Sequence, residues 1–228
     1  MSTAITWYGH AALGIETGGY NLLVDPYLSG NPTASVKPDQ VNPQFILITH
    51  GHGDHIGDTI NIAKRTAALV ISNAEIARWL AAQGVKTHGQ HLGGGFKHPF
   101  GYLKLTMALH GSALPDGSYG GNPAGLLLTT NDSYKIYIAG DTGLFGDMHL
   151  IGEEGIDLAV LPIGDNYTMG PEDALRAVKF IRPGRVIPVH YNTFDLIKQD
   201  PLSWAARVEA ETSTKVCLLR PGDRLALD

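Results

Sequence analysis

Short apolar runs alternate with polar, glycine-rich loops along the whole chain. Apolar runs bounded by turn residues are typical of buried strands. The pattern predicts strands at residues 5–8, 12–16, 20–24, 45–48, 68–71, 102–109, 125–129, 135–139, 157–161, 185–189, 215–219 and 224–227. Short polar turns separate the second strand from the third and the seventh from the eighth, so each of these pairs is expected to form a hairpin.

Helical signals appear between the strands. They predict helices at residues 59–65, 74–83, 147–154, from 171 onward and 202–211. Asp58 and Asn73 are expected to cap the first two helices, and Pro171 occupies a first-turn position. The polar stretches 29–43 and 112–123 are expected to be loops, and residues 87–100 to be irregular.

The chain consists of two similar halves. Each half begins with antiparallel hairpins and continues with strand–helix–strand units, and no linker separates the halves. This order predicts an α/β fold in which two sheets pack together with helices outside. We therefore expect a single domain over residues 1–228.

The composition narrows the classes of protein. Of the 228 residues 43% are hydrophobic, which supplies a core, and the net charge of −5 gives no basic footprint for nucleic acid. The N-terminus does not resemble a signal peptide, and no apolar run reaches the ~20 residues of a membrane span. Cys217, the single cysteine, excludes an intrachain disulfide and is expected to be buried in a strand. These features favour a cytoplasmic enzyme.

The densest group of metal-ligand residues is Thr-His-Gly-His-Gly-Asp-His at 49–55. It follows an apolar run and precedes a predicted helix, so it is expected at the carboxyl end of a strand, where the sites of α/β folds lie. Imidazole and carboxylate groups bind divalent transition metals. The histidines are not four residues apart as on a helix, so a loop must gather them, and Gly51 and Gly53 would let it coil tightly. A solvated polar turn would not explain so many ligand-type residues.

Three more predicted strands end at a residue of the same kind. His110, Asp141 and His190 each follow an apolar run. Either histidine alone could be an ordinary buried or surface residue. At equivalent ends of neighbouring strands, the three residues and the 49–55 loop predict one convergent ligand set.

The order His-x-His-x-Asp-His, then His, Asp and His, resembles the metallo-β-lactamase superfamily over nearly the whole chain. Segments 51–58, 139–142, 161–173 and 189–193 are similar to a prokaryotic branch of metal-dependent hydrolases related to L-ascorbate-6-phosphate lactonases. The resemblance implies a four-layer αββα sandwich of two mixed β-sheets, with metal ions at one edge.

The resemblance also implies a binuclear site for two divalent metal ions. Its ligands would be His50, His52 and His110 for the first ion, Asp54, His55 and His190 for the second, and Asp141 between them. Asp54 would in addition be catalytic, by orienting the attacking water. Nitrogen and oxygen ligands suit Zn²⁺ first, and also Mn²⁺, Fe²⁺ or Ni²⁺. Two such ions activate water and polarise the bond to be cleaved.

Other residues have two interpretations each. His10 and Asp25 fall at strand ends, where they could orient a ligand imidazole or simply form capped turns. The following residues lie in loops on the metal side and could contact substrate or serve turns and helix caps: Asn166, Tyr167, Thr168, Tyr191 and Asn192. Surface positions are expected for His88, His91, His98 and His149.

The sequence thus predicts a metal-dependent hydrolase of a small ester, lactone or phosphoester. A phosphodiesterase or nuclease is one alternative, which acidity and the lack of an RNA-binding arm disfavour. A non-catalytic metal-binding protein is another. His52 stands where flavodiiron proteins carry glutamate, which argues against oxygen reduction. The expected partner is a small molecule rather than a membrane or nucleic acid. The substrate, the native metal, the general acid and homo-oligomer formation stay open.

Overall fold

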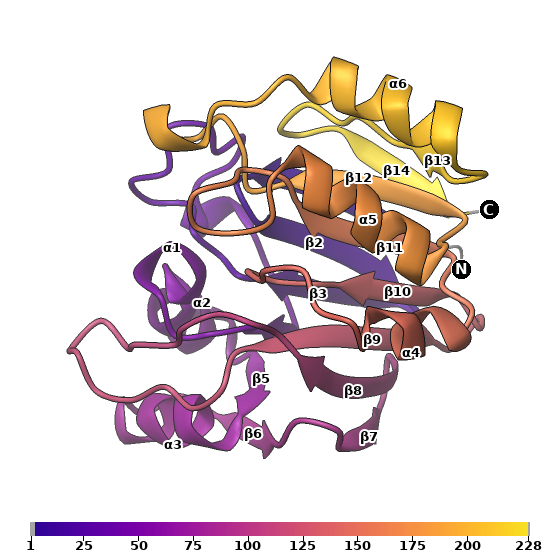
Figure 1. The fold of residues 1–228 in the computed structure, drawn as a ribbon. Coiled ribbons are helices and arrows are strands. Elements are labelled where there is room, and N and C mark those ends of the chain that lie inside the picture. The colour runs from indigo at the N-terminus through magenta and orange to yellow at the C-terminus, as the bar shows by residue number, and fades with distance from the viewer. Residues whose placement is uncertain (1–2, 228) are drawn as a thin grey trace.

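Two seven-stranded mixed sheets make up the centre of the protein (Figure 1). The computed structural model describes residues 3–227. The first sheet runs β14 (Arg224–Leu227), β1 (Thr3–Gly9), β2 (Ala12–Thr17), β3 (Tyr20–Val24), β4 (Phe45–Leu47), β5 (Leu69–Asn73) and β6 (Thr87–Gln90). The second runs β13 (Lys215–Val216), β12 (Arg185–Val189), β11 (Leu158–Pro162), β10 (Lys135–Ile138), β9 (Ala124–Thr130), β8 (Gly101–Met107) and β7 (Gly95–His98).

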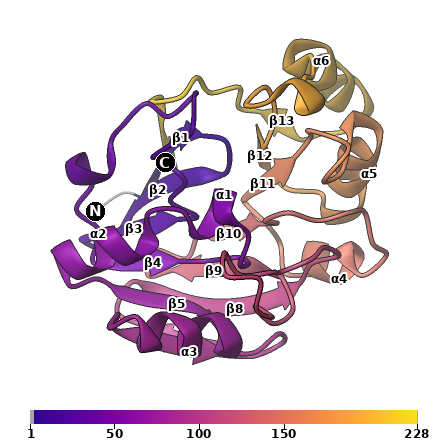
Figure 2. The same cartoon turned by 90° about the vertical axis from the view of Figure 1, so that its left-hand side faces the viewer.

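The helices are α1 (Gly53–Ile56), α2 (Thr59–Thr66), α3 (Ala74–Ala82), α4 (Met148–Glu153), α5 (Pro171–Ile181) and α6 (Pro201–Glu211), with 3₁₀ turns η1 (Pro38–Gln40) and η2 (Asp195–Ile197). The helices α2 to α6 lie outside the two sheets, whereas the single-turn α1 lies at the edge between them (Figure 2). Figure 2 shows α2 and α3 beside the first sheet and α4, α5 and α6 beside the second. The predicted αββα sandwich is therefore confirmed. Within residues 3–227, no helix has the length and apolar character needed to cross a bilayer.

The main core lies between the sheets. Leu103 and Leu105 of β8 face it and are fully buried, whereas Tyr102 is exposed and Lys104 half-buried, as the alternation of a half-buried strand requires. A second core, which includes Ile62 and Leu80, lies between the first sheet and helices α2 and α3. Each fully buried side chain of this size contributes about 1.5–3 kcal/mol to folding.

Some local predictions need correction. Residues 87–100 are not irregular, because β5 and β8 supply backbone partners for β6 and β7 although glycines break the sequence pattern. Asp58 does not cap α2 with its side chain, which instead accepts hydrogen bonds from the backbone of Leu28 and Ser29. Asn73 caps α3 as predicted, accepting from Ile76 N.

The histidine and cysteine placements differ in part from expectation. His98 is buried, not at the surface, because its ring stacks on Phe100 and its Nε2 lies 3.2 Å from the side-chain oxygen of Gln90. His149 is exposed as predicted. Cys217 is only half-buried and follows β13, which is shorter than the predicted strand. His91 is exposed and His88 is half-buried.

Strand direction brings the predicted ligands to one edge. In the first sheet β1, β3 and β4 run the same way, and in the second sheet β8, β10 and β12 do. Their carboxyl ends therefore share an edge in each sheet. Two backbone hydrogen bonds join these edges, from Ala124 N to Thr49 O and from His190 N to His10 O, both 3.0 Å long.

Candidate metal centre

The histidine-rich segment after β4 is only partly a loop. His50 and His52 precede α1, whereas Asp54 and His55 lie within this single helical turn, so the expectation that a loop alone gathers the histidines is corrected. Space restricts Gly51, where a Cβ atom would come 3.1 Å from Ala113 O, but nothing lies within 4 Å of a Cβ at Gly53. The special freedom of glycine is therefore not needed at position 53.

The predicted ligands cluster in three overlapping groups. Within each group one ligand atom per residue lies within 4.8 Å of the others: His50, His52 and His110; His10, Asp54, His55 and His190; and His50, His55 and Asp141. All seven residues predicted as ligands are thus brought together at one edge. The structure adds His10 to them.

Asp141 lies between the first two groups. Its Oδ2 is 3.6 Å from His110 Nε2 and 3.0 Å from His190 Nε2, and its Oδ1 is 3.2 Å from His55 Nε2. Gly140 permits this position, since its φ is +62° and a Cβ there would come 2.9 Å from the Cβ of Thr49. One carboxylate therefore reaches histidines of both groups.

Several buried atoms at this point lie close to an oppositely charged neighbour but form no hydrogen bond with any of the described residues. They include His55 Nε2, His190 Nε2 and Asp141 Oδ1. Buried polar atoms without partners are costly and call for an explanation such as an ion. Tetrahedral ligands at ~2.05 Å from one zinc ion are roughly 3.3 Å apart, close to the distances around Asp141. The residues therefore fit a divalent metal centre.

Asp25 and Thr49 fix the orientation of two of the imidazoles. Asp25 Oδ2 accepts hydrogen bonds from His55 Nδ1 (2.8 Å) and from the Thr49 hydroxyl (2.6 Å). Because that hydroxyl donates to Asp25, it accepts from His50 Nδ1, 3.0 Å away. Nδ1 of each imidazole is therefore held as a hydrogen-bond donor, so Nε2 is the nitrogen that each ring can offer to a metal ion.

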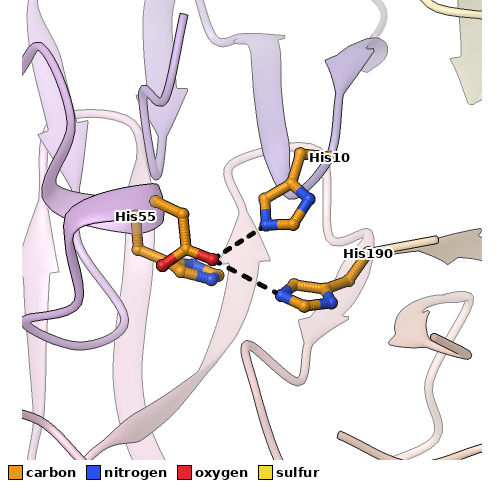
Figure 3. Close-up of side chains that lie close together, drawn as sticks. His10, His55 and His190 are labelled. Atoms are coloured by element: carbon orange, nitrogen blue, oxygen red, sulfur yellow. Dashed lines mark hydrogen bonds and ion pairs between the residues drawn. The ribbon is translucent and has the colours of Figure 1, made fainter. Parts of the chain in front are cut away.

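His10, which the sequence left as an orienting group or a capped turn, lies at the centre of the site. It is fully buried, with φ at +53°, and lies close to His55 and His190 (Figure 3). Its Nε2 is 3.1 Å from Asp54 Oδ2 and its Nδ1 is 2.9 Å from the Thr193 hydroxyl. Since the carboxylate can only accept, Nε2 carries the proton of the neutral ring and Thr193 donates to Nδ1.

The electrostatics of the site favour positive charge beside Asp141. Burial lowers the pKa of both His190 and His55, but the neighbouring carboxylates together outweigh it. Asp141 and Asp54 raise the pKa of His190 to about 9, and Asp141 and Asp25 raise the pKa of His55 well above its usual range. Burial lowers the pKa of His50 well below its usual range and that of His10 to about 4. A metal ion can replace the protons that His55 and His190 otherwise hold.

A pocket of about 260 Å³ opens onto the cluster. It is lined by His52, Asp54, His110, Asp141, Tyr167, His190 and Phe194. Of the loop residues suggested for substrate contact, only Tyr167 lines it. Tyr191 is buried in a stack on Trp7, and Asn192 Oδ1 accepts from Gln199 N. Asn166 is exposed and Thr168 half-buried, and neither lines the pocket.

Sequence reasoning missed three residues of this site. Phe194 lines the pocket, Thr193 contacts His10, and Thr49 links Asp25 to His50. The available signal for Thr49 is its place beside the predicted ligand His50, and for Thr193 its place three residues beyond the predicted ligand His190. Nothing in the sequence shows that their hydroxyls reach partners 24 and 183 residues away.

The geometry agrees with the comparisons with known proteins. A family model described as "Beta-lactamase superfamily domain" matches residues 20–191. The chain belongs to the beta-lactamase superfamily. A metal-dependent hydrolase from Desulforamulus reducens is 50% identical over 230 residues, covering 98% of this chain and 99% of that protein. The chain is accordingly a metal-dependent hydrolase with the metallo-β-lactamase fold.

Solved structures agree with this assignment. Igni18, a metallo hydrolase from the archaeon Ignicoccus hospitalis, is 36% identical, with a TM-score of 0.92 over 100% of this superfamily member and 99% of Igni18. The isothiocyanate hydrolase from Delia radicum gut bacteria has a TM-score of 0.78 at 21% identity, with 98% of each chain covered. The second likeness shows a shared fold.

Proposed function

We propose that this hydrolase holds two divalent metal ions at the joined sheet edges and cleaves a small ester, lactone or phosphoester. His50, His52 and His110 would hold one ion, Asp54, His55 and His190 the other, and Asp141 both. The observation that carries this proposal is the position of Asp141, whose two oxygens face histidines of both groups. The whole chain would act as one domain.

The chemistry that such ions supply, when bound, is to acidify a water molecule and to polarise the scissile bond. The protein positions the reactants. Asp54 lines the pocket and its side chain is 33% exposed, so it can orient the attacking water. His10 holds one oxygen of Asp54, and His10 and His190, against the opposing effect of burial, keep the pKa of Asp54 well below its usual range. Asp54 is therefore an ionised acceptor at neutral pH.

The metal set follows from the donor atoms. All proposed ligands offer nitrogen or oxygen, which suits Zn²⁺ first and also Mn²⁺, Fe²⁺ or Ni²⁺. Asp25 and Thr49 accept hydrogen bonds from Nδ1 of His55 and His50, the ring nitrogen that would not face the metal ion. Zinc-bound histidines in other proteins have orienting partners of this kind. This arrangement supports a resident metal centre rather than a surface cluster of histidines.

The experiment that tests the proposal is a substrate panel run on protein treated with a chelator and then reloaded with Zn²⁺ or Mn²⁺. The panel contains p-nitrophenyl esters, lactones followed by pH indicator, and bis(p-nitrophenyl) phosphate. We expect turnover that disappears with the chelator, returns with metal and is lost in Asp141→Asn. Asp116→Asn, at an exposed carboxylate paired with Trp79, is the matched control and should keep full activity.

Two outcomes would refute the proposal. One is equal activity of the chelated and reloaded protein. The other is metal binding without turnover of any ester, lactone or phosphoester. Preference for the phosphodiester would favour the nuclease alternative, which the pocket does not support because no Lys or Arg of residues 3–227 lines it.

A further inference from the structure

Strained backbone conformations concentrate around the pocket. The non-glycine residues with positive φ at this end of the molecule are His10, Asp25, Asp165, Asn166, His190 and Asn192. Such conformations are unfavourable for residues other than glycine, and they persist where the surrounding structure fixes a functional geometry. Two of the loops that contain these residues, the loop after β11 and the loop after β12, each place an aromatic side chain at the pocket. Tyr167 follows Asn166, and Phe194 follows Asn192 by two residues.

The two loops are tied to each other and to the sheet. Asn192 Oδ1 accepts from Gln199 N at 2.8 Å, and Gln199 Nε2 donates to Gly164 O at 3.0 Å, so the loop after β12 is joined to the loop after β11. Met169 N donates to Thr142 O, close to Asp141. The aromatic side chains are therefore carried on segments fixed relative to the ligands.

Both aromatic residues are exposed although they border buried ligands. Tyr167 is 53% and Phe194 40% exposed, and each lines the pocket that contains His110, Asp141 and His190. Exposed aromatic rings at the rim of a polar site offer apolar contact area that a bound molecule can cover. The volume of about 260 Å³ matches a small molecule.

Apart from the proposed ligand histidines, none of residues 3–227 offers the pocket a cationic side chain for a second charged group. Among residues 3–227, no Lys or Arg lines it. Lys198, the base nearest in sequence to Phe194, pairs with Asp195 at 2.7 Å on the surface. A phosphate or carboxylate remote from the scissile bond would lack the cationic partner that recognition of such groups normally uses.

We infer that Tyr167 and Phe194 form an aromatic clamp that selects small, uncharged esters or lactones with an apolar acyl group, rather than substrates with a remote anionic group. The inference rests on the proposed function of the same site. In this arrangement the proposed ligands would hold the ions beside the reacting carbonyl, and the rings of Tyr167 and Phe194 would cover the apolar part of the acyl group.

Binding of hydroxamates to metal-loaded protein tests the clamp without turnover. The hydroxamate group binds the metal centre, so the affinity ratio of benzohydroxamate to acetohydroxamate isolates the contribution of the apolar group. We expect about tenfold tighter binding of benzohydroxamate by the native protein. The ratio should fall by roughly threefold to tenfold in Tyr167→Ala and in Phe194→Ala, as the loss of an aromatic contact predicts.

Two further variants keep the test specific. Leu196→Ala changes an exposed apolar residue of the same loop outside the pocket, and it should leave the ratio unchanged. Phe194 also contacts the ring of His10, so Phe194→Leu, which retains apolar volume, is measured beside Phe194→Ala with the metal content of both. Phe194→Leu should keep its metal and show an intermediate ratio.

The outcomes separate the clamp from the metal centre. If both hydroxamates bind equally, or if neither aromatic variant changes the ratio, the clamp is wrong and the metal centre stands. If neither hydroxamate binds metal-loaded protein, the metal centre is wrong and the clamp with it. A hydroxamate of terephthalic acid, with a carboxylate at its far end, should bind more weakly than benzohydroxamate, and tighter binding would overturn the proposed selection against anionic groups.

Discussion

Replacing Asp25 with asparagine should weaken metal binding at the proposed site of Asp54, His55 and His190. Asp25 is not itself a proposed ligand and acts through its hydrogen bond with His55. Asp25 is buried, and its two oxygens accept hydrogen bonds from Thr49 N, the Thr49 hydroxyl and His55 Nδ1. Asparagine retains one acceptor oxygen, but its NH₂ group would face the proton on His55 Nδ1. The imidazole would then move its proton to Nε2, the atom that faces Asp141, and could no longer bind a metal ion there.

The magnitude follows from the contacts. Loss of such an orienting partner typically lowers metal affinity roughly 10–100-fold, which is about 1.4–2.7 kcal/mol. Two hydrogen bonds to a charged acceptor are also lost, and partial recovery by the amide leaves a cost to metal-free folding of about 2–3 kcal/mol. For a chain of this size that cost lowers the melting temperature by about 5–10 °C.

The assay compares Asp25→Asn with Asp58→Asn. Asp58 is a buried carboxylate that accepts from two backbone amides and touches none of the proposed ligands, so its variant should lose stability and keep native metal affinity. Zinc affinity is measured by competition with a chromophoric chelator, and stability by thermal unfolding of metal-free protein. Native metal affinity in Asp25→Asn, or an equal loss in both variants, would refute this reasoning.

Three other changes test separate parts of the site. Asp54→Asn should reduce turnover on the order of 100-fold, with a melting temperature within about 2 °C of native, and unchanged turnover would remove Asp54 from the reaction. His110→Ala should lose one metal ion per chain by elemental analysis, whereas His10→Ala should keep both and lose roughly 10–100-fold in activity; the reverse metal contents would contradict the ligand assignment. Burial lowers the pKa of His98 to about 4, so unfolding takes up a proton as pH falls from 6.5 towards 4 and stability decreases there. His98→Leu should flatten this dependence by on the order of 1 kcal/mol in urea unfolding of metal-free protein between pH 7 and pH 5, and an unchanged slope would show that His98 is not the group responsible.

The sequence predicts the fold well where apolar runs are long and bounded. The hairpin of β9 and β10 and the helix α5 follow from local pattern and turn residues alone. The strands β6 and β7 were not predictable in this way, since Gly89 and Gly95 interrupt the alternation and long-range pairing supplies the order. Local signals cannot report a partner strand that is distant in the chain.

In the site, too, local sequence predicts some features, whereas others depend on residues distant in the chain. Side chains that follow buried strands could be named from the sequence, because strand ends in such folds share an edge. His10 could not be placed, since its position depends on a left-handed backbone conformation and on partners 44 and 183 residues away. Phe194 was missed for a similar reason. Its ring reaches the pocket because of how the loop after β12 turns, which the residue types do not reveal.

The metal content of saturated protein tests the central claim most directly. The chelator-treated chain is loaded with excess Zn²⁺ or Mn²⁺, freed of unbound ions and measured by elemental analysis against protein concentration. We expect two metal ions per chain in the native protein, because Asp141 faces ligands of two groups. Partial loading before saturation is compatible with a weaker second site, but one ion or none per chain at saturation would contradict the binuclear centre.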